Sequence, residues 1–514
     1  PRRDSRPGNL FHNLEGRFQS VTDLAGANDT GYGQGVSAGD YNDDGFEDLF
    51  ICNIGRNTLL RNNGDGTFTD VTNETGLNTL QEWSVSAAIA DVNGDGNCDI
   101  ITVNYCGGPD VYTRQCTAPQ INEPRLCAPQ TFSGVNDAIW WGRDDGTFQQ
   151  GNELTVDVPG RGMGLLVGTF ATNSNDAATI SSPTKSIPLS IFVTNDTTQN
   201  HLWSMGSKNR WIETGEVSGL ATDFQSLSQG SMGIAAADFD ADARVDFFIT
   251  NFAQEHNGFL LQSHTNQWTD RTHAARLAKP SMAMVGFGTA ATDFDGDGGI
   301  DLIVANGHVD DNAYRGQPFR MPAQIFTRQL LTRDADESQW KSTGGSMLGS
   351  YFAEDHIGRS LAIGDLDRDG RVDAIVTHLF DPTALLINRS PGGIPPLALD
   401  LVATQNGRSA TGAVITVQSA DVAVDSKPKH HFVFAGDGYA CRDQPTQFIP
   451  WPSGRSRDER ANGELNLKIR WPSGTTTQHT IPKTGHYKII QNVKKPFQQS
   501  IATDVADRER DETR

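Results

Sequence analysis

The sequence predicts an all-β protein, in which a β-propeller of six or seven blades is followed by a small β-sandwich-like domain. Two observations support this fold class. A short acidic segment with an apolar run behind it occurs five times, at intervals that fit four short strands plus loops. After residue 390 the repeat stops and alternating strands begin. The expected divisions are an N-terminal extension at 1–9, the propeller at 10–390, a linker at 391–396, the second domain at 397–494 and a polar tail at 495–514.

Each acidic segment has the pattern D-x-[DN]-x-D-G-x-x-D, and a second signature follows it. That signature is clearest in residues 57–77, where an apolar strand, an Asp-Gly turn and a short strand indicate an antiparallel hairpin. A sixth copy, near residues 165–195, keeps its strands but has lost the acidic positions. Residues 10–26 correspond to the second signature alone, and the last repeat ends near Asn388. We therefore expect segments from both ends of the repeat region to close a ring.

The acidic segments have the chemistry of a site for a hard cation. Calcium takes six to eight oxygen ligands, and alternate residues of a tight loop can direct their oxygens to one point. A single loop of this kind is equally well explained as an Asp/Asn/Gly turn. Five loops in phase, each with three or four carboxylates, would repel themselves without a cation. Magnesium is the weaker candidate because it keeps more of its water.

The sequence thus predicts about five structural calcium ions, which would roughly halve the formal net charge of −21. One loop has Ala243 where the pattern has glycine. The expected ligands are positions 1, 3, 5, 7 and 9 of each loop: Asp40, Asn42, Asp44, Phe46 and Asp48; Asp91, Asn93, Asp95, Asn97 and Asp99; Asp238, Asp240, Asp242, Arg244 and Asp246; Asp293, Asp295, Asp297, Gly299 and Asp301; Asp365, Asp367, Asp369, Arg371 and Asp373.

These loops and the trailing NNGDGTFTDVT resemble FG-GAP/VCBS repeats, the calcium-loop blades of integrin-type propellers. The G-A-x-V-x-V strand at 412–417, the GDGY turn at 436–439 and the WPSG turn at 471–474 resemble the ASPIC/UnbV domain, from which residues 441–463 depart. The combination resembles the cartilage acidic protein family of secreted animal and bacterial proteins. The resemblance implies an extracellular or cell-surface location.

Six cysteines indicate at least one disulfide. Three lie in a polar stretch whose spacings of ten and eleven residues do not fit a zinc knuckle, so we expect a bridge among Cys106, Cys116 and Cys127. A second bridge is expected between Cys52 and Cys98, which follow acidic loops in neighbouring repeats. Four N-x-[ST] sequons are candidate glycosylation sites: Asn28, Asn73, Asn195 and Asn388.

Two classes of function remain. The negative charge argues against nucleic acid as a partner, and no apolar run is long enough to span a membrane. We favour a non-enzymatic extracellular scaffold or adhesion protein, whose partner is a protein, a carbohydrate or another copy of the chain. The alternative is a metal-dependent lyase or dehydratase acting on carbohydrate. Its candidate centre is the acid-base cluster Glu354, Asp355 and His356, with His256, His308 and His378 beside the later repeats.

Overall fold

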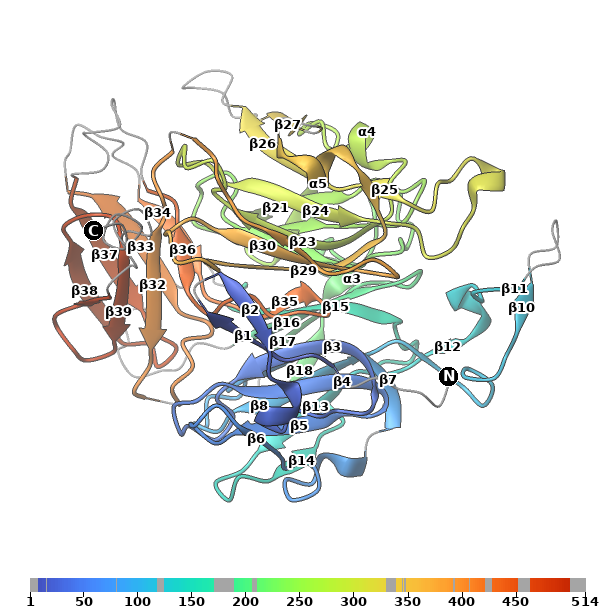
Figure 1. Ribbon diagram of the computed structural model, residues 1–514, viewed down its shortest axis with the longest axis horizontal. Coiled ribbons are helices and arrows are strands. Elements are labelled where there is room, and N and C mark those ends of the chain that lie inside the picture. Colours follow the sequence, from blue (N-terminus) through green and yellow to red (C-terminus); the bar gives the residue numbers. More distant parts are fainter. Residues whose placement is uncertain are drawn as a thin grey trace, which may run out of the picture.

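The computed structural model describes most of residues 8–499, and strands dominate it (Figure 1). Among the described residues, no helix has the length and apolar character that a membrane crossing requires. The description leaves out residues 1–7, 15, 80, 118–123, 171–188, 206–209, 330–338, 344, 346–347, 392, 406, 421–427, 452–462 and 500–514, which include the space between the strands of the eroded sixth repeat.

The described residues form six antiparallel blades, which confirms the propeller. The inner strands of successive blades contact one another in chain order. The first three blades are β3 (Tyr32–Gly39), β4 (Asp48–Arg56), β5 (Thr58–Asn62) and β6 (Phe68–Asp70); β7 (Gln81–Ala90), β8 (Asp99–Asn104), β13 (Ala138–Gly142) and β14 (Phe148–Gln150); β15 (Gly162–Gly168), β16 (Ser190–Asn195), β17 (His201–Met205) and β18 (Trp211–Glu213). The last three are β19 (Ile234–Ala237), β20 (Asp246–Ile249), β21 (Gly258–His264) and β22 (Gln267–Asp270); β23 (Gly286–Thr292), β24 (Asp301–Asn306), β26 (Gln324–Gln329) and β27 (Gln339–Thr343); β29 (Gly358–Gly364), β30 (Asp373–His378) and β31 (Ala384–Leu386).

The apolar runs of the second strands are buried because each blade packs between two others. All six residues of β8 are buried, and so are all six of β24. One core cluster joins Phe248 of the fourth blade to Leu302 and Phe326 of the fifth. A strand covered on both faces reads as a continuous apolar run rather than an alternating one.

The N-terminal segment bridges the last blade and the first. β1 (Phe11–Leu14) and β2 (Arg17–Ser20) pair with each other, and Asn13 Nδ2 donates to Leu366 O beside the sixth blade, at 2.6 Å. The following helix α1 (Thr22–Ala25) packs on the first blade, where Ala25 and Leu60 share a core cluster. The ends of the repeat region therefore meet as expected, although β1 and β2 form a sheet of their own.

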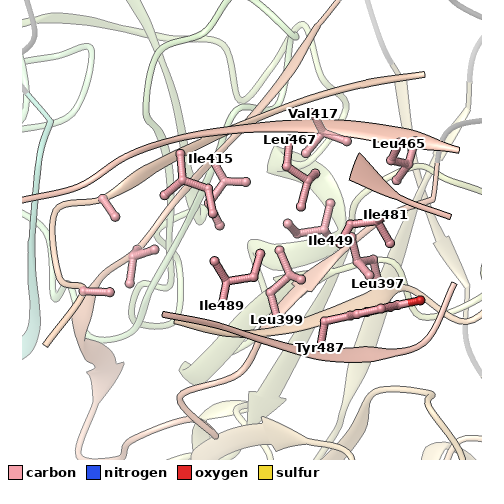
Figure 2. Close-up of a cluster of buried hydrophobic side chains, with 14 of the residues drawn as sticks. Leu397, Leu399, Ile415, Val417, Ile449, Leu465, Leu467, Ile481, Tyr487 and Ile489 are labelled. Carbon is pink, nitrogen blue, oxygen red and sulfur yellow. The ribbon is translucent and has the colours of Figure 1, made fainter. Parts of the chain in front are cut away.

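The C-terminal module is a sandwich of two four-stranded sheets. Leu399, Ile415, Leu467 and Ile489 meet in its core (Figure 2). Trp471 is fully buried and its Nε1 donates to Thr477 Oγ1, so this residue stabilises the module. The sheets are β36 (Gln447–Ile449), β32 (Leu397–Val402), β39 (His486–Ile490) and β40 (Phe497–Gln498), and β34 (Lys429–Phe432), β33 (Val414–Ser419), β37 (Leu465–Arg470) and β38 (Thr476–Ile481).

One strand of the module leaves the sandwich and enters the propeller. β35 (Ala435–Tyr439) contains the GDGY sequence that was predicted to be a turn of the second domain, but it pairs with β15 of the third blade. It also contacts the inner strands β7, β19, β23 and β29, and it lies at the centre of the blades (Figure 1). The two glycines permit this approach: Gly438 has a φ of +82°, and a Cβ there would lie 2.6 Å from Ile234 O.

Substitution of Gly438 tests whether this central strand stabilises the whole protein. Gly438→Ala combines a left-handed backbone with a clash against β19, so we expect a loss of about 2–4 kcal/mol. Gly146→Ala is the matched control, because Gly146 has a φ of +76° and nothing within 4 Å of its Cβ position. The control should lose only about 1–2 kcal/mol, the cost of the backbone conformation. Equal losses in urea denaturation would contradict the central role of β35.

Candidate metal centres on one face of the propeller

The five acidic loops lie on one face of the propeller because each connects the first strand of its blade to the second. The position-9 aspartate is in every case the first residue of the second strand: Asp48, Asp99, Asp246, Asp301 and Asp373. The repeat that has lost its acidic positions forms the third blade. Residues 171–188, between the first two strands of that blade, lie outside the described residues.

One hydrogen-bond network recurs in all five loops. The position-1 carboxylate accepts the N–H of position 6 at 2.8–3.0 Å. The position-5 carboxylate accepts the N–H of position 7 at 2.7–3.0 Å. The position-9 carboxylate accepts the N–H of position 2 at 2.8–3.1 Å. Ala243 keeps this network with a φ of +70°, so the loop without the glycine has the same shape as the others.

Carboxylate oxygens converge most closely in three loops. Three carboxylates offer oxygens within 4.8 Å of one another in each of these groups: Asp238, Asp240 and Asp246; Asp293, Asp295 and Asp297; Asp365, Asp367 and Asp373. In the sixth blade, Oδ1 of Asp365 and Oδ1 of Asp367 are buried without a hydrogen-bond partner. The first two loops have an amide at position 3, and Asn42 and Asn93 each donate to the position-5 carboxylate.

Burial raises the pKa of the carboxyl groups at positions 1 and 9 in every loop. The pKa of Asp246 rises to about 9, and the pKa values of Asp99 and Asp301 rise to about 8, from an ordinary 3.8. Neighbouring carboxylates of the same loop add to the effect of burial. The loops therefore hold negative charge where it is costly, which a bound cation would relieve.

The C-terminal module contacts this same face. Arg408 donates its N–H to Asp43 Oδ1 at 3.0 Å, and its Nε lies 3.6 Å from Asp40 Oδ2 of the first loop. Lys429 Nζ donates to Gly298 O of the loop in the fifth blade, at 3.1 Å. Asp365 of the loop in the sixth blade donates its N–H to Gln444 Oε1 at 2.9 Å. The acidic loops thus form part of the surface that the module packs against.

The cysteine predictions are half correct. Cys116 and Cys127 form the expected disulfide, and Cys106 is a buried free thiol. The predicted bridge between Cys52 and Cys98 is wrong, because both are buried free thiols. Cys52 lies four residues after the position-9 aspartate of its loop, whereas Cys98 lies one residue before it. Relative to the position-9 aspartate, the two cysteines therefore differ by five residues. At the rise of an extended chain this places them at levels roughly 16 Å apart along their blades.

The four sequons differ in exposure. Asn28 and Asn73 are exposed, and Asn388 is half-buried with its Nδ2 donating to Phe294 O and Val372 O. Asn195 is fully buried and its Nδ2 donates to Gln199 O at 2.7 Å. The folded chain therefore does not present Asn195 for glycosylation.

The structure brings together only two of the candidate histidines. The rings of His356 and His378 lie 5.3 Å apart, whereas His308 contacts Phe252 and His256 contacts Phe224. Glu354 and Asp355 are exposed. This end of the sixth blade is opposite the acidic loops, because His378 ends the strand that Asp373 begins.

A ladder of buried asparagines at that opposite end was missed in the sequence, although its spacing is regular. In five blades a buried asparagine lies at or near the end of the second strand: Asn53, Asn104, Asn195, Asn251 and Asn306. Three of them donate their backbone N–H to the side-chain oxygen of a second asparagine, at 2.8–3.0 Å. These second asparagines directly precede the next strand: Asn57, Asn200 and Asn257. These side-chain bonds satisfy backbone N–H groups that have no partner on a neighbouring strand where the chain turns.

The raised carboxyl pKa values predict how the metal-free protein responds to pH. The folded state binds protons that the unfolded state releases above an ordinary pKa of 3.8, so stability should fall as the pH rises from about 4 towards 8 or 9. Metal-free protein should therefore melt several degrees lower at pH 8 than at pH 5, and added calcium should reverse the loss at pH 8. A melting temperature independent of pH in metal-free buffer would contradict this reading of the loops.

Comparisons with known proteins agree with this architecture. Residues 40–102 match the FG-GAP-like repeat family. The chain is 23% identical to cartilage acidic protein 1 of Xenopus tropicalis over 368 residues, 69% of this chain and 48% of that protein. It is 23% identical to cartilage acidic protein 1 of Mus musculus over 476 residues, 87% of this chain and 62% of that protein. It therefore spans about half to three fifths of the length of these relatives.

Among solved structures, an Agrocybe aegerita lectin that recognises non-reducing terminal N-acetylglucosamine aligns with a TM-score of 0.40 and 14% identity, over 75% of this chain and 92% of the lectin. The sequence matches, together with the six blades, identify the repeats. The chain contains an FG-GAP-like repeat within a β-propeller and is similar to cartilage acidic protein 1.

Proposed function

We propose that the protein is an extracellular calcium-binding scaffold or adhesion protein without enzymatic activity. The observation that carries this proposal is the recurrence of one carboxylate geometry in five loops on one face. Repetition of this kind serves the whole ring, whereas an active site needs one asymmetric group of side chains. The ions would be structural, held by the odd-numbered positions of each loop.

The donor set fits calcium. All side-chain donors of the loops are carboxylate or amide oxygens, which hard cations prefer and zinc or copper do not. The unpartnered buried oxygens of Asp365 and Asp367 are open for a ligand bond. A bound cation would supply positive charge to the loop. The backbone N–H groups described above fix the carboxylates in the positions from which they would bind it.

Three features support a location outside the cell. Extracellular calcium modules bind with dissociation constants of about 10⁻⁴ to 10⁻³ M, far above cytosolic calcium. The Cys116–Cys127 disulfide suits an oxidising compartment, and the remaining described thiols are largely buried. The similarity to cartilage acidic protein 1 is consistent with that location.

The partner surface would be the face opposite the loops, or the rim. The module already covers part of the loop face, and β35 occupies the propeller centre. The opposite end of the blades carries exposed apolar side chains, including Phe380. A protein, a carbohydrate or a second copy of the chain would bind there.

Calcium stoichiometry tests the metal part of the proposal. Calorimetric titration of metal-free protein should give about five calcium ions per chain. Asp297→Asn should remove one of them, because all five loops have an aspartate at position 5. Asp145→Asn is the matched control, since Asp145 is exposed in a hairpin turn and accepts the N–H of Thr147. Unaltered stoichiometry in Asp297→Asn, or a decrease in the control, would contradict the ligand assignment.

The non-enzymatic part is tested by imaging the calcium-loaded protein alongside a turnover screen on polysaccharides. Ordered assemblies or a bound partner, without turnover, would support the scaffold. Turnover that disappears in His356→Ala, with the calcium-dependent melting temperature kept, would instead establish the carbohydrate enzyme that the sequence left as the alternative.

A further inference from the structure

The sixth blade departs from the asparagine ladder at one position. In the four blades with both an acidic loop and a buried asparagine, that asparagine lies five residues after the position-9 aspartate. Five residues after Asp373 the chain has His378, which is partly exposed. An amide that serves the fold is thus replaced by an imidazole, which is a common metal ligand.

Hydrogen bonds fix the proton on one nitrogen of each ring of the pair His356 and His378. His378 Nδ1 lies 2.7 Å from Pro382 O, and His356 Nε2 lies 2.9 Å from Tyr351 O. A carbonyl oxygen only accepts, so each of these ring nitrogens donates an N–H. The lone pairs are therefore on His378 Nε2 and His356 Nδ1. Donation of the second ring N–H to a carbonyl is the arrangement that orients histidines as metal ligands.

A tyrosine hydroxyl contacts the pair, and a carboxylate lies nearby in the sequence. The Tyr351 ring stacks on His356 with centroids 4.1 Å apart, and its hydroxyl donates to His378 Nε2 at 2.9 Å. Asp381 follows three residues after His378, and both of its carboxylate oxygens accept from Arg320 at 2.7 Å. The Arg320 guanidinium lowers the pKa of Asp381, so this carboxylate is ionised at neutral pH.

The turn that carries these groups is held in an unfavourable conformation. Phe380 is 81% exposed and has a φ of +73°, a left-handed conformation that bulky residues rarely adopt. This turn returns Pro382 O to His378 Nδ1 and so fixes the tautomer. Strained, exposed turns persist where the surroundings determine them, and they are common at binding sites.

We propose that His356 and His378 bind a borderline divalent transition-metal ion such as Zn²⁺, through His356 Nδ1 and His378 Nε2. The Asp381 carboxylate, which is paired with Arg320, supplies negative charge near the ion, and water completes the coordination. When the ion binds, the Tyr351 hydroxyl gives up its hydrogen bond to His378 Nε2. The site differs from the acidic loops in face and in chemistry, because imidazole suits zinc and carboxylate oxygens suit calcium.

Zinc titration in saturating calcium tests the site, since calcium then occupies any oxygen-only loops. We expect one zinc ion per chain and at least a tenfold loss of affinity in both His378→Asn and His356→Gln. His378→Asn restores the residue that the other blades carry, so this variant should fold. Asp381→Asn should weaken binding several-fold.

His264→Gln is the control, because His264 is exposed at the end of β21, outside the cluster. It should bind zinc as the unaltered chain does. The calcium-dependent melting temperature of every variant reports folding independently of zinc. The proposal is overturned if the unaltered chain binds no zinc, or if His378→Asn and His356→Gln bind it within twofold of the unaltered chain.

Discussion

The structure depends on carboxylates that are buried at one end of the blades. Each acidic loop places its first and last aspartates against backbone N–H groups, which hold the loop in a single shape. The same burial raises the pKa values of these groups, so their ionised form destabilises the fold. Neutralisation of the loops, by protons or by a bound cation, therefore stabilises the propeller and the module that packs on it.

The two ends of the blades consequently differ in their interactions: charged groups meet at one end, and neutral amides meet at the other. At the loop end, Arg408 and Lys429 of the module contact loop residues, and β35 continues from there to the propeller centre. At the opposite end, the side-chain oxygens of Asn57 and Asn257 cap the turns by accepting the backbone N–H groups of Asn53 and Asn251. Only the sixth blade has a titratable side chain, His378, at this position among the described strand ends.

Repetition explains how much could be predicted from sequence. The five acidic loops, the hairpins behind them and the β-rich second domain were readable because each signal occurs several times in phase. The sequence did not predict that Cys52 and Cys98 are free thiols. Whether two cysteines of neighbouring blades can pair depends on their positions along the strands, and the repeat alignment alone did not bring this out. The position of the GDGY segment in the propeller was also not predicted. Its glycines indicate a turn, but Gly438 is required because the backbone there lies close to β19. The His356 and His378 cluster depends on Tyr351, which the repeat does not mark.

Hydrogen-exchange mass spectrometry with and without a calcium chelator at neutral pH is the most direct test of the central claim. Chelation should speed exchange together in the five loops, in β35 and in the module segments around Arg408 and Lys429, while the asparagine-capped ends keep their protection. Loops and module that exchange at the same rates with and without the metal would show that charge neutralisation does not hold this face together.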